Sequence, residues 1–209
     1  MRISRLLGLS LAAAALTVGS ASAENVLRWT SQGDALTLDP HSQNEGPTSV
    51  MNGQMYESLV TRDAKLALAP ELAERWAPEG DSAWRFHLRK GVKFHGGEDF
   101  TAEDVAFSFE RAKNKASDFK DQIKSVKSVK VIDDYTVDII TDGPNPILPN
   151  QLTNIYIMDK GWAEKNNVVK PQDFSAKEEN YAVRNANGTG RKDRVAPKQE
   201  LVGRQVVSR

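Results

Sequence analysis

A stretch of 28 residues from Trp84 to Arg111, WRFHLRKGVKFHGGEDFTAEDVAFSFER, guides the interpretation of the whole chain. Its first part alternates apolar and polar side chains, with Trp84, Phe86 and Leu88 on one side, as in a strand with one buried face. The glycine pair at 96–97 then indicates a turn. The stretch therefore predicts a strand followed by a tight turn.

The second part of the stretch changes to a helical period. Thr101 is a suitable N-cap, and the two acidic residues at 103–104 place negative charge where the helix dipole favours it. Val105, Phe109 and Ala112 recur at helical spacing, which predicts a buried apolar stripe. Arg111 lies near the other end of this helix, where a cation is favoured.

Two histidines in this stretch raise the question of a metal or catalytic site. His87 shares the polar side of the strand with arginines, which favours a solvated side chain. His95 lies in the turn beside Glu98 and Asp99 and could ligate a metal. Zinc sites need three or four ligands, however, and the sequence has no HExxH motif and no cysteine cluster. The stretch is therefore interpreted as a scaffold, with no nucleophile placed next to a base.

The first 23 residues have the pattern of a secretory signal peptide. Arg2 and Arg5 precede a mostly apolar run, Leu6 to Val18, and the sequence Ala-Ser-Ala at 21–23 is an A-x-A cleavage site. The run is shorter than the roughly 20 residues of a membrane-spanning helix. The sequence has no cysteine that could carry a lipid anchor. We therefore expect export to the periplasm, with cleavage after Ala23.

Charge and composition argue against several classes of protein. The sequence has 28 basic and 28 acidic residues, and loss of the first 23 residues removes two arginines and no acidic residue. This near balance gives no field that would attract nucleic acid or an anionic membrane. Because the sequence has no cysteine, the fold must be stabilised by its core rather than by disulfides.

The rest of the chain mixes hairpins and helices. The loop at 31–49 is long enough to suggest a functional role, the proline-rich segment at 143–150 cannot be a central strand, and Gly-Thr-Gly at 188–190 is too weak a motif to indicate a phosphate loop. The mixture predicts an α/β or α+β lobe. We expect strands at 26–30, 59–63, near Trp76 and at 155–159, a hairpin at 125–141 turning at Asp133–Asp134, and helices from about Thr48, at 160–167 and at 177–184.

The order of motifs resembles the extracellular solute-binding proteins of bacterial ABC importers, of the peptide/nickel type (family 5). The resemblance covers about residues 27–190. Its most specific part is the run LRKGVKFHGGEDFTAEDV at 88–105. Gly96–Gly97 departs from the more usual Asp-Gly or Asn-Gly, which changes only the turn. The other motifs are LTLDPH (36–41), MYESLVTRD (55–63), LAPELAERW (68–76), VKSVKVIDDYTVDI (126–139) and NANGTG (185–190).

The resemblance implies an α/β fold of the periplasmic-binding-protein type II-like kind, with a mixed sheet, hairpins and helices. In that family two lobes close over a ligand and deliver it to a membrane permease. We expect residues 24–190 to be the N-terminal lobe, the first lobe only and incomplete, which alone would bind its ligand weakly. The family usually continues after NGTG with proline and an aromatic residue. Residues 191–209 contain no aromatic residue, so we expect an aberrant polar tail from a frameshift or truncation, with a genuine short variant as the alternative.

The resemblance also implies which residues contact a ligand. In this family the segment after LDP and the segment after the proline-rich stretch approach the cleft. Glu45 could pair with an amino group, and Asn44 and Asn154 could bond amide groups. Surface or capping roles are the alternative, for instance Thr48 as an N-cap. The candidate ligand-binding residues are Asn44, Glu45, Gly46, Thr48, Asn154 and Tyr156.

We therefore predict a monomeric periplasmic binding component that takes up peptides or similar small solutes with an ABC permease in the inner membrane. We expect no enzyme activity, no cofactor, no metal and no nucleic-acid partner. Two alternatives stay open. One is an exported hydrolase-like enzyme that uses His87 or His95 with a carboxylate, and the other is a non-functional truncated remnant. The sequence does not identify the ligand.

Overall fold

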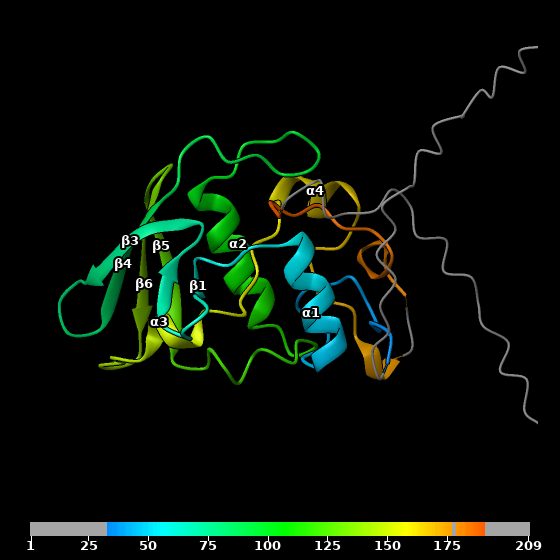
Figure 1. Ribbon diagram of the computed structural model, residues 1–209, viewed down its shortest axis with the longest axis horizontal. Helices are drawn as coiled ribbons and strands as arrows, with labels where there is room; N and C mark the ends of the chain where they lie inside the picture. Colours follow the sequence, from blue (N-terminus) through cyan, green and yellow to red (C-terminus); the bar gives the residue numbers. More distant parts are fainter. Residues whose placement is uncertain (1–32, 177–178, 191–209) are drawn as a thin grey trace, which may run out of the picture. The chain divides into compact units, whose positions relative to one another are not determined.

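The computed structural model of the chain describes residues 33–176 and 179–190 (Figure 1). The expected signal peptide at 1–23, the expected strand at 26–30 and the expected polar tail at 191–209 lie outside the described residues.

A four-stranded antiparallel sheet, with strand order β3-β4-β6-β5, is built from the two predicted hairpins. Strands β3 (Ala73–Pro78) and β4 (Ala83–Leu88) form the first, and strands β5 (Val126–Asp133) and β6 (Thr136–Thr141) form the second. Pairing of β4 with β6 joins them. Phe86 of β4 is fully buried while its neighbours in sequence are half-buried, so the alternation predicted for this strand is confirmed.

Helix α2 (Ala102–Ala112) packs on one face of this sheet, mainly against β5 (Figure 1). The Asp104 carboxylate fixes its first turn by accepting hydrogen bonds from the Thr101 backbone N–H at 2.8 Å and from the Thr101 hydroxyl at 3.1 Å. Val105, Phe109 and Ala112 are fully buried in the core below. The predicted N-cap and the predicted apolar stripe are both confirmed.

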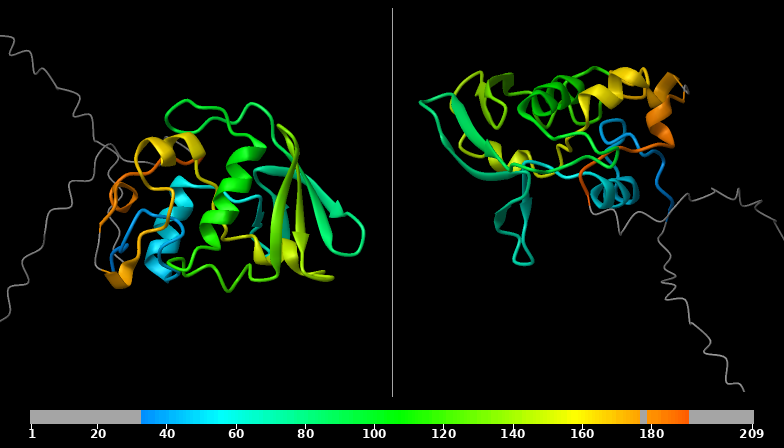
Figure 2. Two further views of the ribbon diagram at one scale, coloured as in Figure 1. Left: turned by 180° about the vertical axis from the view of Figure 1, so that it is seen from behind. Right: turned by 90° about the horizontal axis from the view of Figure 1, so that it is seen from above.

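Smaller elements complete the described part of the chain. Helices α1 and α4 lie on the side of α2 that faces away from the sheet, as the view from above in Figure 2 shows. No helix among the described residues is both long enough and apolar enough to cross a bilayer. The remaining elements are α1 (Gly46–Met55), the hairpin of β1 (Val60–Arg62) and β2 (Leu68–Pro70), α3 (Leu148–Gln151), α4 (Lys160–Lys165), and the 3₁₀ helices η1 (Phe174–Ala176) and η2 (Tyr181–Val183).

Two predicted boundaries were wrong by one or two residues. Helix α1 begins at Gly46 rather than Thr48, because the side chain of Glu45 caps it. The second hairpin turns at residues 134–135 rather than at Asp133–Asp134, because β5 still pairs at Asp133 with Thr136 of β6.

Two other predicted elements were also wrong. The segment 155–159 is not a strand, since only Tyr156 forms a bridge, to Ser58, and the Met158 N–H is bound by the Ser108 hydroxyl instead. The helix expected at 177–184 is, in its described part, only the single 3₁₀ turn η2, which the Asn180 side chain caps through the Ala182 N–H.

Candidate ligand-binding site

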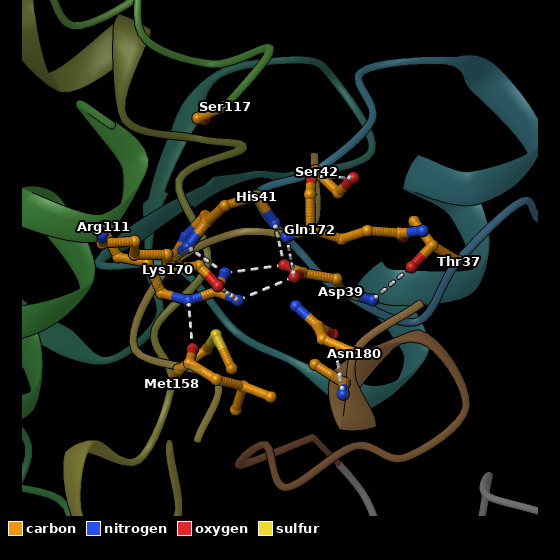
Figure 3. A network of polar contacts seen from close by, with 12 residues as sticks. Thr37, Asp39, His41, Ser42, Arg111, Ser117, Met158, Lys170, Gln172 and Asn180 are labelled. Carbon is orange, nitrogen blue, oxygen red and sulfur yellow. Dashed lines mark hydrogen bonds and ion pairs between the residues drawn. The ribbon is translucent and has the colours of Figure 1, made fainter. Parts of the chain in front are cut away.

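A buried ion pair joins the long loop after residue 33 to the end of helix α2 (Figure 3). Arg111 donates hydrogen bonds to both carboxylate oxygens of Asp39, from Nη1 to Oδ1 at 2.6 Å and from Nη2 to Oδ2 at 2.7 Å. Both side chains are fully buried. Burial is the largest effect and would raise the pKa of Asp39, but the Arg111 guanidinium and the hydrogen bond from the Gln172 N–H together hold that pKa below its ordinary value. The two residues are therefore a charged, bidentate pair inside the protein.

His41 is the third member of this buried cluster. Its Nδ1 lies 3.2 Å from Nη1 of Arg111, which can only donate, so Nδ1 accepts and the proton is on Nε2. Nε2 donates to the Tyr156 carbonyl oxygen at 2.9 Å. Burial first, and then the Arg111 charge, lower the pKa of His41 to about 3. His41 is therefore a neutral linker between the ion pair and the segment containing Tyr156.

The ion pair also positions the chain that follows helix α4. Arg111 donates to the carbonyl oxygens of Val168 at 3.0 Å and Lys170 at 3.1 Å. Asp39 accepts a hydrogen bond from the Gln172 N–H at 2.9 Å, and the Ser42 hydroxyl donates to the Gln172 carbonyl oxygen at 2.9 Å. Three segments that are distant in sequence therefore meet at one buried charge pair.

Helix α2 presents a second, polar stripe beside its apolar one. Asp104, Ser108 and Arg111 are spaced by four and three residues, so they lie on one face of the helix, and all three are buried. Asp104 accepts from the Lys160 N–H, and the Ser108 hydroxyl accepts from the Met158 N–H. Together with the bonds of Arg111 to Val168 and Lys170, this stripe forms hydrogen bonds with backbone groups at four positions between 158 and 170. These bonds fix that segment against the helix.

Four of the six candidate ligand residues lie at the start of helix α1. Asn44 and Gly46 are exposed and Glu45 is half-buried. The Glu45 carboxylate accepts from the Thr48 N–H at 2.8 Å, and the buried Thr48 hydroxyl accepts from the Leu36 N–H at 2.8 Å. Two of the four are therefore occupied in capping the helix and bracing the loop. The alternative role considered for Thr48, as the N-cap, was wrong, because Glu45 takes that role.

The other two candidates, Asn154 and Tyr156, differ in exposure. Tyr156 is buried, and its hydroxyl donates to the Ser49 carbonyl oxygen of α1 at 3.3 Å. Asn154 is exposed. The structure thus brings Tyr156 against the middle of α1, at Ser49 and Gly53. A direct contact of any of the six residues with a ligand stays a prediction.

A polar surface groove opens beside the segment that contains the first four candidates. It consists of two adjoining depressions of about 410 Å³ and about 300 Å³, which share Lys115, Ala116 and Asp173 in their walls. Gln43, next to Asn44, lines the larger depression, and its side-chain amide donates to the Asp118 carboxylate at 3.2 Å. We call these two depressions together the polar groove.

Neither histidine of the stretch 84–111 lies in a cluster of possible metal ligands among the described residues. His95 binds the Gly190 carbonyl oxygen through Nε2 at 2.8 Å, while its N–H donates to the Gly188 carbonyl oxygen. His87 is half-buried on β4 opposite Thr136. Across residues 33–176 and 179–190, no group of three or more His, Cys, Asp and Glu side chains could hold a metal ion. His95 therefore joins the turn at 96–97 to the segment 187–190.

The comparisons with known proteins show the family. The family model described as "Bacterial extracellular solute-binding proteins, family 5 Middle" matches residues 67–191, more than half of the chain. The chain therefore belongs to the family 5 bacterial extracellular solute-binding proteins, as its motifs suggested.

Three relatives illustrate the similarity. The periplasmic oligopeptide-binding protein OppA of Escherichia coli is 28% identical over 171 residues, which are 68% of this chain and 32% of OppA. Among solved structures, the ABC transporter-associated periplasmic binding protein DppA from Helicobacter pylori in complex with peptide STSA is 28% identical, with a TM-score of 0.64 over 75% of this chain and 34% of DppA. NikZ from Campylobacter jejuni in complex with Ni(L-His) is 27% identical, with a TM-score of 0.63 over 76% of this chain and 30% of NikZ.

The chain spans about a third of the length of each of these three relatives. Its mixed α/β architecture with antiparallel sheets is that of part of a type II periplasmic binding protein, so the predicted fold class is confirmed.

The sequence patterns did not identify the buried cluster of Asp39, His41 and Arg111. Arg111 was interpreted as a cation at a helix end, although it is fully buried in an ion pair. One signal was available. The spacing of Asp104, Ser108 and Arg111 forms a helical stripe of its own beside the apolar one, which indicates a second packed face.

Proposed function

We propose that this chain is part of the periplasmic binding component of an ABC importer, which binds peptides or similar small solutes and delivers them to a permease in the inner membrane. The observation that carries the proposal is the family 5 match over residues 67–191. Further support comes from the relatives, since OppA is named an oligopeptide-binding protein and DppA was solved with a bound peptide.

In this proposal the ligand lies beside the start of helix α1. Asn44 and Asn154 bond its amide groups, and the backbone at Gly46 allows it to approach closely. Glu45 already caps the helix through one oxygen, and its other oxygen faces the ligand's amino group. Thr48 and Tyr156 form the support behind these residues, because both side chains are buried and hydrogen-bonded to backbone groups.

The proposed role is binding without chemistry. The buried cluster below the site contains a carboxylate, an imidazole and a guanidinium, but each is paired with protein groups and inaccessible to a solute. In this proposal the protein works as a monomer, without a cofactor or a metal, and its partners are the solute and the permease.

Export and domain boundaries are part of the same proposal. Residues 1–23 are removed in the periplasm, and residues 24–190 form the N-terminal lobe. N-terminal sequencing of the protein recovered from the periplasm should begin at Glu24. Recovery of a product that still contains Leu6 to Val18 would contradict the assigned signal peptide.

Uptake by cells tests the function directly. A strain lacking the gene is compared with its parent for uptake of isotope-labelled di- to pentapeptides, with a labelled free amino acid as the control solute. The proposal predicts reduced uptake of at least one peptide class, unchanged uptake of the amino acid, and restoration by the gene supplied on a plasmid. Unchanged uptake of every peptide would contradict the proposal.

A further inference from the structure

The polar groove rests on the buried ion pair. Its walls come from Gln43, from the loop after helix α2 at 115–118, and from the segment 173–175. Each wall lies near the pair or a residue bonded to it. Arg111 is near the end of α2, Gln172 donates to Asp39 and precedes Asp173, and Ser42, which precedes Gln43, donates to Gln172. The three walls are therefore held in place by one desolvated charge pair, which gives the groove a preorganised floor.

Two lysines of the groove, Lys115 and Lys170, have no ion-pair partner in the described part of the chain, and of these only Lys115 lines both depressions. Lys115 is exposed and enters none of the ion pairs formed there. Its charge lies close enough to Asp173 to help lower the pKa of that carboxyl, after the larger effect of the hydrogen bond from Ser175. An ammonium group at this position is available to an anion that enters the groove.

Three carboxylates line the groove, and they differ in availability. Glu179 is paired with Arg184. Asp173 is occupied, since its Oδ1 accepts hydrogen bonds from the Ser175 N–H, the Ser175 hydroxyl and the Ala176 N–H. Asp118 is exposed and accepts through Oδ2 from Gln43 at 3.2 Å. Its Oδ1 receives no hydrogen bond from the described residues. Asp118 accepts one hydrogen bond from the described residues and Asp173 accepts three, so Asp118 is the less occupied carboxylate and the one assigned to a cationic group.

We propose that the polar groove binds the charged ends of a short peptide, with Lys115 holding its carboxylate and Asp118 holding its ammonium group together with Glu45. This inference rests on the proposed function and specifies the ligand chemistry of that site. Charges of both signs on one rim match a zwitterion, whereas a ligand of a single sign would meet repulsion from one of them. Phe174, which is 44% exposed in the same wall, supplies apolar contact for the body of the peptide.

An NMR titration of the full 209-residue chain tests the groove. Amide chemical shifts are followed while trialanine is added to millimolar concentrations, beside the same peptide acetylated at its N-terminus and amidated at its C-terminus. We expect shifts of residues 43–46, 115–118 and 173–175 with the free peptide and at most weak shifts with the blocked peptide. Shifts located elsewhere, no shifts, or equal binding of the two peptides would overturn the proposal.

Matched variants test which residue binds the carboxylate of the peptide and which binds its ammonium group. Lys115→Gln and Asp118→Asn should each weaken trialanine binding by about fivefold, the upper end for one exposed ion pair. Lys65→Gln, an exposed lysine on the β1–β2 hairpin, should leave it unchanged. Lys115→Gln should also abolish the preference for a free carboxylate over an amide, and a variant that keeps this preference would exclude Lys115. If peptide uptake by cells is lost on gene deletion while these variants bind normally, the proposed function stands and the groove assignment fails.

Discussion

Arg111 is the residue on which the local structure depends most. Replacing one member of a buried ion pair leaves the other charge buried and unpaired, which costs about 3–5 kcal/mol. We therefore predict that Arg111→Met lowers the free energy of unfolding by about this amount in urea titrations. Arg184→Met is the matched control, because its ion pair with Glu179 is more than half exposed on both sides and such pairs contribute at most about 1 kcal/mol.

A double substitution separates pairing from simple loss of packing. Asp39→Asn combined with Arg111→Met removes both charges, so it should cost less than the sum of the two single changes. Additive costs, or equal costs for Arg111→Met and Arg184→Met, would show that the buried pair does not act as described.

His41 predicts a specific dependence of stability on pH. Its pKa is lowered from 6.5 to about 3 in the folded protein, so only the unfolded chain gains a proton there as pH falls below 6.5. Stability from this group is therefore complete above pH 6.5 and is lost as pH falls, with a slope approaching about 1.4 kcal/mol per pH unit.

Urea unfolding at about pH 7 and about pH 5 measures this slope. His41→Gln should reduce the loss of stability on acidification, whereas His87→Gln should retain the loss seen in the natural sequence. The carboxyl groups whose pKa values burial raises act in the opposite direction, and they are common to all three proteins, so they cancel in the comparison. Identical slopes for the two variants would exclude the proposed protonation state of His41.

At the scale of elements, helix α2 is held by the buried side chains on its apolar face. Phe109 is fully buried against the sheet, and truncation of a buried phenylalanine costs about 3–5 kcal/mol. We predict this loss for Phe109→Ala in urea melts. Lys113→Ala should stay within about 1 kcal/mol, because its ion pair is with an exposed Glu110. Similar losses for the two variants would refute the register of the helix.

The segment 187–190 depends on close contact with the end of helix α1. A Cβ added at Gly188 would lie 2.0 Å from the Met55 carbonyl oxygen, whereas one added at Gly143 meets no atom within 4 Å. We predict that Gly188→Ala costs about 1–3 kcal/mol and exposes residues 187–190 to proteolysis, while Gly143→Ala does neither. Resistance of the Gly188 variant to proteolysis would contradict this docking contact.

The elements that the sequence predicted well are those with strong periodicity. The alternation through Phe86 and the stripe through Val105 and Phe109 each report one buried face, so strand β4 and helix α2 were both correct. The same reasoning wrongly predicted a strand at 155–159. The apolar residues of that segment are buried, but its N–H groups bond to partners outside a sheet, such as the Ser108 hydroxyl. Periodicity reports burial and does not report where backbone hydrogen bonds go.

At the scale of the molecule, the candidate site depends on contacts that no local sequence pattern encodes. Asp39 and Arg111 are 72 residues apart, and Asp39 and Gln172 are 133 apart. The resemblance to a family pointed to the segment at 44–48, which the structure places beside the polar groove. It did not point to Lys115 or Asp118, which lie in the loop after α2.

Photo-crosslinking tests most directly the claim that this chain binds a peptide over the site at 43–48 and the polar groove. A tripeptide with free termini and a benzophenone side chain is irradiated with the full chain, and the modified residues are mapped by mass spectrometry. We predict crosslinks within 43–48, 115–118 and 173–175 that excess trialanine removes. Crosslinks confined to the sheet of β3, β4, β6 and β5, or labelling that trialanine does not reduce, would contradict the claim.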